Sequence, residues 1–152
     1  MTEFKPRNPD FERRVRDSFA RQRVMHTIGA TLTRIEPGVV EITLPFRDDL
    51  TQQHGYTHAG IVGTIADSAG GYAGFSLMPP GSTVLSVEYR MHLLAPARGE
   101  KLVARGQVVR SGRTLTVCEL KVEAVTGAER STCAIGTQTL ICLPEGEDRP
   151  AG

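Results

Sequence analysis

Residues 59–78, AGIVGTIADSAGGYAGFSLM, form a long apolar stretch of this 152-residue chain, and they decide its fold. The stretch contains one charged residue, Asp67, and five glycines, and Pro-Pro-Gly follows it at residues 79–81. A transmembrane helix is a poor interpretation, because the glycines, the hydroxyl side chains and a central carboxylate do not suit a lipid-spanning segment. The stretch therefore predicts a buried helix of a globular domain that the prolines terminate.

The chain after residue 81 has the composition and alternation of β-strands. Before the helix, residues 30–45 predict a β-hairpin that turns at Pro37-Gly38. One long helix among strands with hairpin-type connections indicates the α+β class, in which a single curved antiparallel sheet wraps around a long central helix. The strands expected after the helix, separated by segments rich in glycine, proline and serine, lie at 82–94, 101–110, 114–125 and 130–143.

An extra helix is expected at the N-terminus, over residues 10–29. Phe11, Val15 and Phe19 recur at the four-residue spacing of one helical face, and Gly29 is suited to end the helix. The expected organisation is an N-terminal helical extension, one main domain and a flexible polar tail, at residues 1–28, 29–144 and 145–152.

Charge and cysteine content exclude several classes of protein. With 18 Lys+Arg against 17 Asp+Glu, the formal net charge is +1, so the chain lacks the basic surface that binds nucleic acid or anionic membranes. The three cysteines, Cys118, Cys133 and Cys142, lie in apolar stretches, which is typical of reduced core residues. The polar first residues do not resemble a secretory signal. Together these features predict a cytoplasmic protein with no nucleic-acid or membrane partner.

The glycines of the central helix are its most informative feature. The chain has 16 glycines, and five of them fall in residues 59–78. A glycine inside a helix costs about 1 kcal/mol relative to alanine. We expect that cost to be offset by close approach of another backbone, either from a sheet curled around the helix or from a second copy of the helix. The alternative is a helix that breaks near Gly70-Gly71.

Asp67 and the start of the same helix are the candidate chemical groups. A carboxylate among apolar residues is expensive to bury unpaired, so Asp67 is either a general base or nucleophile, a hydrogen-bonded core aspartate, or a solvent-facing residue. Residues 52–60, QQHGYTHAG, lead into the helix N-terminus, where unpaired N–H groups can bind a developing oxyanion. His58 lies at that end, and its alternative interpretation is a capping histidine without a catalytic role.

The spacing of these groups predicts a dimer. Asp67 lies nine positions after His58, which is roughly 13 to 14 Å along a helix axis. The two residues of one helix therefore cannot act together on one carbonyl group. If both are catalytic, each site combines the helix N-terminus of one chain with Asp67 of an antiparallel second copy, and the protein is a homodimer.

The run Gln52-x2-Gly55-x2-His58-Ala59-Gly60-x6-Asp67 resembles the signature of hotdog-fold acyl-CoA thioesterases of the PaaI-like, phenylacetate-degradation type. The resemblance extends over residues 29–143. Two departures are visible: Gln52 stands where the family more often has asparagine, and the family's His-Gly-Gly reads His58-Ala59-Gly60 here. The resemblance implies a hotdog fold and hydrolysis of an acyl or aroyl thioester to a free acid and coenzyme A.

The resemblance also implies roles for particular residues. Asp67 would attack the thioester or activate water, and the N–H of Ala59, at the helix end shared with Gly60, would polarise the carbonyl. His58 would orient that end of the site, Gln52 would contact the thioester region, and Ser86 matches a hydroxyl that positions water. Candidates for contacts with the acyl group or coenzyme A are Tyr56, Tyr72, Arg90, Gly112 and Arg113.

The same resemblance implies no cofactor other than the coenzyme A of the substrate, and a homodimer that can pair into a homotetramer. His54 and His58 have the spacing of two zinc ligands, but no third ligand is near in the sequence, so no metal site is predicted. Two other functions remain as alternatives, namely a non-catalytic acyl-CoA binding or sensor module on the same fold and an enoyl-CoA hydratase.

Overall fold

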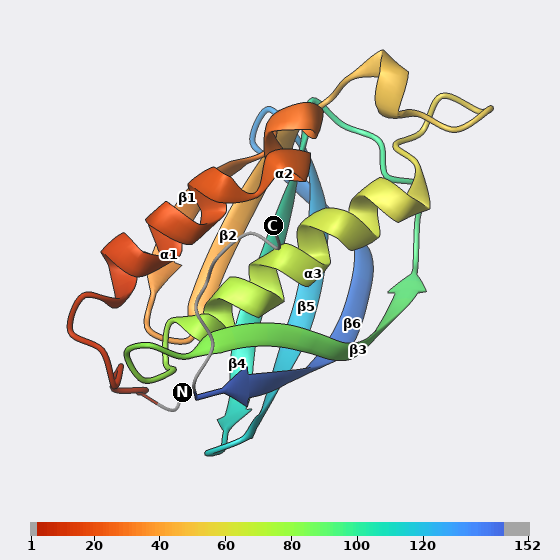
Figure 1. Cartoon of the computed structure of the whole chain (residues 1–152). Helices are drawn as coiled ribbons and strands as arrows, with labels where there is room; N and C mark the ends of the chain where they lie inside the picture. The colour runs from red at the N-terminus through yellow and green to blue at the C-terminus, as the bar shows by residue number, and fades with distance from the viewer. Residues whose placement is uncertain (1–2, 145–152) are drawn as a thin grey trace.

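The computed structural model describes residues 3–144, and the predicted flexible tail at 145–152 lies outside the described residues. Two short helices precede a hairpin, a long helix follows, and four long strands complete the chain (Figure 1). The elements in order are α1 (Phe11–Arg21), α2 (Arg23–Ile28), β1 (Thr31–Glu36), β2 (Val39–Pro45), the 3-10 helix η1 (Asp48–Leu50), α3 (Ala59–Phe75), β3 (Thr83–Leu93), β4 (Lys101–Ser111), β5 (Leu115–Thr126) and β6 (Glu129–Leu143).

The strands form one antiparallel sheet of six strands in the order β1-β2-β4-β5-β6-β3. The sheet curves around α3, which contacts β2, β3, β4, β5 and β6 (Figure 1). The predicted α+β class, with a long helix wrapped by one curved antiparallel sheet, is confirmed. Within residues 3–144 β3 pairs with β6 alone, so the strand that follows α3 is an edge of the sheet.

Helix α3 is continuous over its 17 residues, so the alternative of a break at Gly70-Gly71 is wrong. At two of these glycines the close neighbour is a side chain from the sheet of the same chain, not the backbone that was expected. A Cβ on Gly74 would lie 2.3 Å from Leu140 Cδ1, and one on Gly70 would lie 1.9 Å from Gln138 Oε1. At Gly71, by contrast, a Cβ would meet nothing within 4 Å. Glycine therefore lets the sheet lie closer to α3 than other residues would allow.

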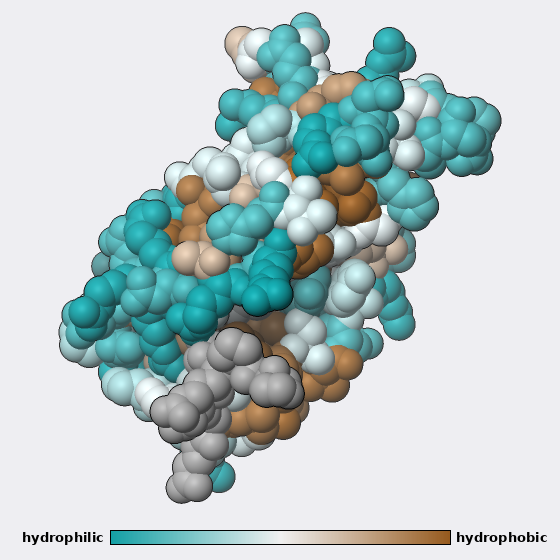
Figure 2. Space-filling model, turned by 45° about the horizontal axis from the view of Figure 1, so that its top comes forward, coloured by the Kyte–Doolittle hydropathy of each residue, from teal (hydrophilic) through white to brown (hydrophobic). Residues whose placement is uncertain are grey.

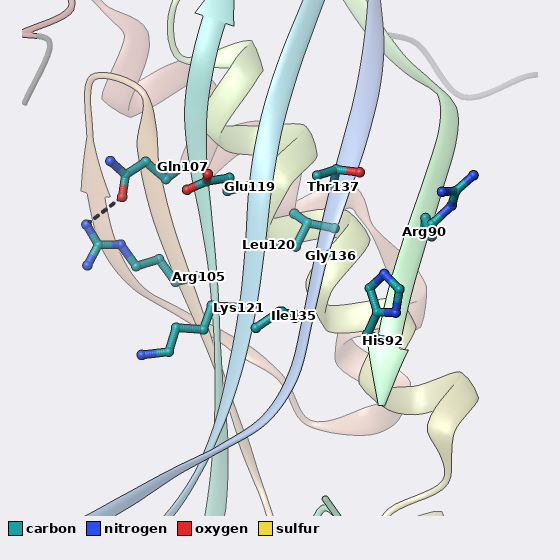
Figure 3. Close-up of a pocket in the computed structure, with 10 residues that line it drawn as sticks. All are labelled: Arg90, His92, Arg105, Gln107, Glu119, Leu120, Lys121, Ile135, Gly136 and Thr137. Carbon is teal, nitrogen blue, oxygen red and sulfur yellow. Dashed lines mark hydrogen bonds between the residues drawn. The ribbon is translucent and has the colours of Figure 1, made fainter. Parts of the chain in front are cut away.

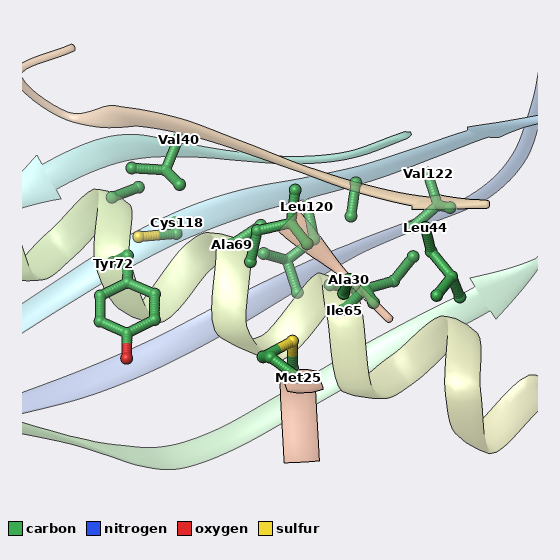
Figure 4. Packing of buried hydrophobic residues seen from close by; sticks show 14 of the residues in the cluster. Met25, Ala30, Val40, Leu44, Ile65, Ala69, Tyr72, Cys118, Leu120 and Val122 are labelled. Carbon is green, nitrogen blue, oxygen red and sulfur yellow. The ribbon is translucent and has the colours of Figure 1, made fainter. Parts of the chain in front are cut away.

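The hydrophobic core fills the space between α3 and the sheet (Figure 4). Ile65 and Ala69 of α3 are fully buried against Ile42 of β2 and Leu120 of β5, whose exposed fractions are at most 2%. The three cysteines are buried free thiols. The alternating apolar positions of the strands therefore face the helix, as their pattern indicates.

The N-terminal segment forms two helices where the sequence predicted one. Gln22 leaves the helical conformation, with φ −79° and ψ 91°, and separates α1 from α2. The break changes the buried face, so that Met25 is fully buried while Val24 is 44% exposed. The Gln22 side chain accepts a hydrogen bond from Ser68 of α3 at 3.1 Å, and this bond ties the break between α1 and α2 to the central helix.

Arg14 of α1 provides a second attachment to the main domain. Its guanidinium donates to the carbonyl oxygens of Pro79 and Ser82 and lies 4.1 Å from the centre of the Phe75 ring. In the space-filling view, hydrophilic side chains cover most of the visible face, with smaller apolar patches between them (Figure 2). Among residues 3–144, no helix is long and apolar enough to cross a bilayer.

We expect Cys118 to resist thiol reagents in the native protein. Burial raises the pKa of its thiol to about 12. The reactive form is the thiolate, so at pH 8 only about 10⁻⁴ of this thiol would be reactive, even before access is considered. Mass spectrometry after iodoacetamide treatment should find Cys118 modified in guanidinium and unmodified in buffer. Labelling of native Cys118 as fast as a free thiol would contradict this burial.

Candidate active site

Asp67 lies in the middle of α3, half-buried, and two side chains from the sheet hold its carboxylate. Ser86 Oγ of β3 donates to Asp67 Oδ1 at 2.7 Å, and Gln138 Nε2 of β6 donates to the same oxygen at 2.6 Å. Gln138 Nε2 also donates to Ser86 Oγ at 3.0 Å. Both donors converge on Oδ1, and Oδ2 has no hydrogen-bond partner among residues 3–144. The carboxylate is thus fixed through one oxygen and available through the other.

A β-bulge in β3 decides which side chains of this strand face Asp67. In the pairing with β6, Ser86 lies opposite Leu140 and Glu88 opposite Thr139, so Val87 is the extra residue. Strict alternation from Ser86 would place Arg90 on the helix side. The bulge instead turns Tyr89 toward α3, where its hydroxyl oxygen lies 3.4 Å from the Cβ position of Gly63.

Gln138 is a site residue that the sequence reasoning missed. It is fully buried and lies between the outward-facing Thr137 and Thr139. The available signal was its polarity: alternation assigns position 138 to the helix side of β6, where a glutamine needs a hydrogen-bond partner. The partner, Asp67, lies 71 positions away in the chain, so only the folded sheet identifies it.

The start of α3 is capped by His58. Its Nδ1 accepts a hydrogen bond from the Gly60 N–H at 2.8 Å, and this bond places the proton of a neutral ring on Nε2. The Gly60 N–H is therefore occupied. The N–H of Ala59, the first residue of the helix, has no hydrogen-bond partner among residues 3–144. Of these two donors, the Ala59 N–H is the one free to bind an oxygen.

A pocket of about 440 Å³ adjoins this helix end. Gln52 and Tyr56 lie on its wall beside Ala59, and the Gln52 side chain accepts from the His54 N–H, which leaves its amide nitrogen free to donate. Apolar residues make up most of the remaining wall. These are Val62, Leu93, Leu94, Ala95, Pro96, Ala97 and Cys133.

Backbone hydrogen bonds hold the wall of this pocket in place. The carbonyl oxygen of Cys133, at a bulge of β6, accepts from the N–H groups of Leu94 and Ala95 at 2.9 and 3.3 Å. On the opposite side, the Thr57 N–H donates to Ala97 O at 3.1 Å. The pocket is therefore formed by structured loops at the end of α3.

The predicted site residues form two separate groups within one chain. Gln52, Tyr56 and Ala59 lie together at the pocket, whereas Asp67 and Ser86 lie together with Gln138. Asp67 lies eight positions after Ala59 in a continuous helix, which is about 12 Å along the axis. One chain thus has a carboxylate centre and an N–H centre that cannot meet on one small group.

Three other predicted contacts lie elsewhere. Tyr72 is 6% exposed, and its ring packs at 5.9 Å from Phe19 and 6.3 Å from Phe75, so it belongs to the core beneath α1. Five positions separate it from Asp67, which turns its side chain about 140° around the helix. Gly112 and Arg113 lie in the turn between β4 and β5, where the Gly112 carbonyl accepts from Arg7 at 3.4 Å.

Arg90 lies on the face of the sheet opposite α3, on the wall of a hollow of about 430 Å³ (Figure 3). Its neighbours there include His92 of β3, Arg105 of β4 and Lys121 of β5. The bulge at Val87 is the physical reason, because it moves Arg90 to the face opposite the one that carries Ser86. In the described part of the chain, no three His, Cys, Asp or Glu side chains gather as metal ligands do.

A long helix wrapped by one curved antiparallel sheet is the architecture of the hotdog fold. The family model described as "Thioesterase superfamily" matches residues 54–131, about half of the chain. The chain belongs to the thioesterase superfamily, a family of thioester hydrolases.

Individual relatives agree with this assignment. A crystal structure of a thioesterase family protein from Silicibacter pomeroyi has 49% sequence identity and a TM-score of 0.86, covering 88% of this chain and 98% of that one. The proofreading thioesterase EntH of Klebsiella pneumoniae is 26% identical over 113 residues, 74% of this chain and 82% of that protein.

The E. coli PaaI protein from the phenylacetic acid degradation operon has 17% identity and a TM-score of 0.78, covering 87% of this chain and 92% of that one. At that identity the likeness shows the fold alone. The resemblance to the hotdog thioesterases of the PaaI-like type is thereby confirmed at the level of family and fold.

Proposed function

We propose that this protein is an acyl-CoA thioesterase that hydrolyses an acyl or aroyl thioester to the free acid and coenzyme A. The observation that carries the proposal is the Asp67 carboxylate, which Ser86 and Gln138 hold through Oδ1, while no described residue bonds to Oδ2. A carboxylate held in this way has one oxygen oriented for reaction. Membership of the thioesterase superfamily supports the reaction type.

The complete site of this proposal combines two chains. The helix rise separates Asp67 from the Ala59 N–H, so an antiparallel second copy must bring its own Ala59 end to Asp67. Strand β3 supports a dimer, because it is a sheet edge whose Leu85, Val87 and Leu93 are each more than half exposed. Gly71 lies one turn after Asp67 on the same side of the helix, and a Cβ there would meet nothing within 4 Å in the described part of the chain. Such a homodimer could pair further into a homotetramer.

The chemistry follows from the two centres. The thioester carbonyl oxygen accepts from the Ala59 N–H at the positive end of the helix dipole, which stabilises the negative charge that develops there. Asp67 then acts in one of two ways. It attacks the carbonyl carbon to form an acyl anhydride that water opens, or it takes a proton from the attacking water. In both routes the C–S bond breaks, the coenzyme A thiolate takes up a proton, and the acid leaves.

In this proposal Gln52 contacts the thioester through its free amide nitrogen, His58 orients the helix end through its capping bond, and Tyr56 lines the acyl pocket. The reaction needs no cofactor beyond the coenzyme A of the substrate. We place the protein in the cytoplasm, in agreement with its buried free thiols.

Release of free thiol from a panel of acyl-CoA substrates tests the proposal directly. The panel should include short, medium, long and aromatic acyl groups, with hydrolysis followed by a thiol-reactive dye. We expect at least one substrate to be turned over with no metal or redox cofactor added. Tight binding in calorimetry without thiol release from any substrate would instead identify a binding module.

Ala59→Pro tests the N–H centre without removing the helix. Proline is well tolerated at the first residue of a helix, and His58, at φ −58° and ψ 138°, already has the extended backbone required before proline. Only the free N–H is lost, so we expect kcat to fall by about 10²–10³-fold, the usual effect of removing an oxyanion donor. Ala59→Ser, which keeps the N–H, is the control and should retain most activity. Equal kcat in the proline and serine variants would remove this N–H from the mechanism.

A further inference from the structure

The Gln138 side chain has three hydrogen-bond acceptors around it, and all of them share the two N–H groups of its amide nitrogen. Nε2 donates to Asp67 Oδ1 at 2.6 Å, to the main-chain oxygen of Asp67 at 3.1 Å and to Ser86 Oγ at 3.0 Å. One amide group thus joins the carboxylate of Asp67 to the backbone of the same residue. This arrangement restrains rotation of the Asp67 side chain relative to the helix, which a single bond from Ser86 would not do.

The other end of the same amide has no partner. Gln138 Oε1 is buried and accepts no hydrogen bond from the described residues. Rotating the amide by half a turn would place this oxygen against three oxygens of Asp67 and Ser86, so the orientation is determined by its surroundings. A buried acceptor without a donor destabilises the folded state, and an apolar side chain of the same shape would avoid that cost.

Gly70 makes room for this amide. A Cβ at position 70 would lie 1.9 Å from Gln138 Oε1 and 2.5 Å from Leu120 Cδ2. The helix therefore has a residue of low helix propensity where the amide contacts it. Both the unpaired Oε1 and Gly70 oppose stability, and both serve to bring Gln138 Nε2 to Asp67.

We propose that Gln138 is a positioning residue that holds the Asp67 carboxylate in its reactive orientation. The inference rests on the proposed function, in which Asp67 carries the reaction. Gln138 has no exposed surface, so it acts through Asp67 and does not touch the substrate. Its loss should lower kcat and leave KM and folding largely unchanged.

Gln138→Met is the direct test, because methionine matches the length of glutamine and has neither the amide donor nor the unpaired oxygen. We expect the midpoint of denaturant unfolding to stay the same or rise, KM to change by less than about threefold, and kcat to fall by about 10–100-fold. Leu140→Met is the matched control, since Leu140 is also buried on the helix side of β6, two positions further. It should keep wild-type kcat.

Gly70→Ala perturbs the same amide from the other side, and Gly74→Ala is its matched control. Each added methyl overlaps the end of a side chain from β6, which is Gln138 Oε1 at 1.9 Å for position 70 and Leu140 Cδ1 at 2.3 Å for position 74. Gly70→Ala also overlaps Leu120 Cδ2 at 2.5 Å, so it should lower the unfolding midpoint at least as much as Gly74→Ala. Only Gly70→Ala should show the fall in kcat.

The outcomes separate this inference from the proposed function. Activity retained in Asp67→Asn would reject the role of Asp67 itself. With Asp67→Asn inactive, full kcat in Gln138→Met would overturn the positioning role alone. A lower unfolding midpoint in Gln138→Met, with a kcat loss that Leu140→Met shares, would make Gln138 a purely structural residue and would also overturn the inference.

Discussion

Asp67→Asn should lower kcat by roughly 10²–10⁴-fold, because it removes the carboxylate that, in the proposed mechanism, attacks the thioester or activates water. The substitution leaves the local structure intact for a specific reason. Both hydrogen bonds from Ser86 and Gln138 reach Oδ1, and the carbonyl oxygen of an asparagine can accept the same two bonds. The substitution replaces only Oδ2, the oxygen without these bonds, by an NH2 group. Steady-state kinetics on the best substrate of the thiol-release panel would measure the loss.

Two measurements make this result interpretable. Calorimetry should show that Asp67→Asn still binds the acyl-CoA, because the pocket beside Ala59 does not include position 67. The unfolding midpoint should stay near that of the wild type. Turnover close to wild type in the folded variant would show that Asp67 is a hydrogen-bonded core aspartate, and the proposed mechanism would fail.

A mixture of two inactive variants should recover activity if the site is shared between chains. In a mixed dimer of Asp67→Asn and Ala59→Pro protomers, one site carries both defects and the other carries neither. Random pairing makes half of the dimers mixed, so we expect about a quarter of wild-type activity for a two-fold symmetric dimer. That recovery is at least tenfold above either variant alone. Refolding the two proteins together from denaturant and assaying thiol release would measure it.

The control for this mixture uses a double variant. When Asp67→Asn is refolded with Asp67→Asn/Ala59→Pro, no pairing restores an intact site, so activity should stay at the background. Activity of the first mixture no higher than the average of its components would mean that Asp67 and Ala59 do not share a site. Sedimentation of a stable, active monomer would rule out the two-chain site independently.

The location of Asp67 on the helix and the N–H groups at the helix start followed from sequence spacing, because a helix has a constant rise per residue. The same rise per residue placed the two further apart along the helix axis than one thioester group extends. The structure agrees, placing Gln52, Tyr56 and Ala59 at the pocket and Asp67 with Ser86. The spacing could not show that His58 Nδ1 accepts a hydrogen bond from the Gly60 N–H, since a histidine at that position could equally have faced the substrate.

The predicted ligand residues show where local patterns fail. Tyr72 points into the core because its side chain lies about 140° around the helix axis from that of Asp67. Arg90 would have shared the face of Ser86 if β3 alternated strictly. The extra residue at Val87 places Arg90 on the opposite face of the sheet, and no local sequence signal marks the bulge.

The amino-acid sequence by itself determined the α+β class, the long central helix, the succession of strands along the chain and the family to which the chain belongs. These follow from patterns within short windows: the glycine-rich apolar stretch, the alternation of the strands and the motif that ends at Asp67. Only the tertiary structure decided that Gln138 holds Asp67, that β3 is bulged at Val87 and that the sheet lies against Gly70. Each of these depends on pairing between residues far apart in the chain, and local periodicity contains no information about that pairing.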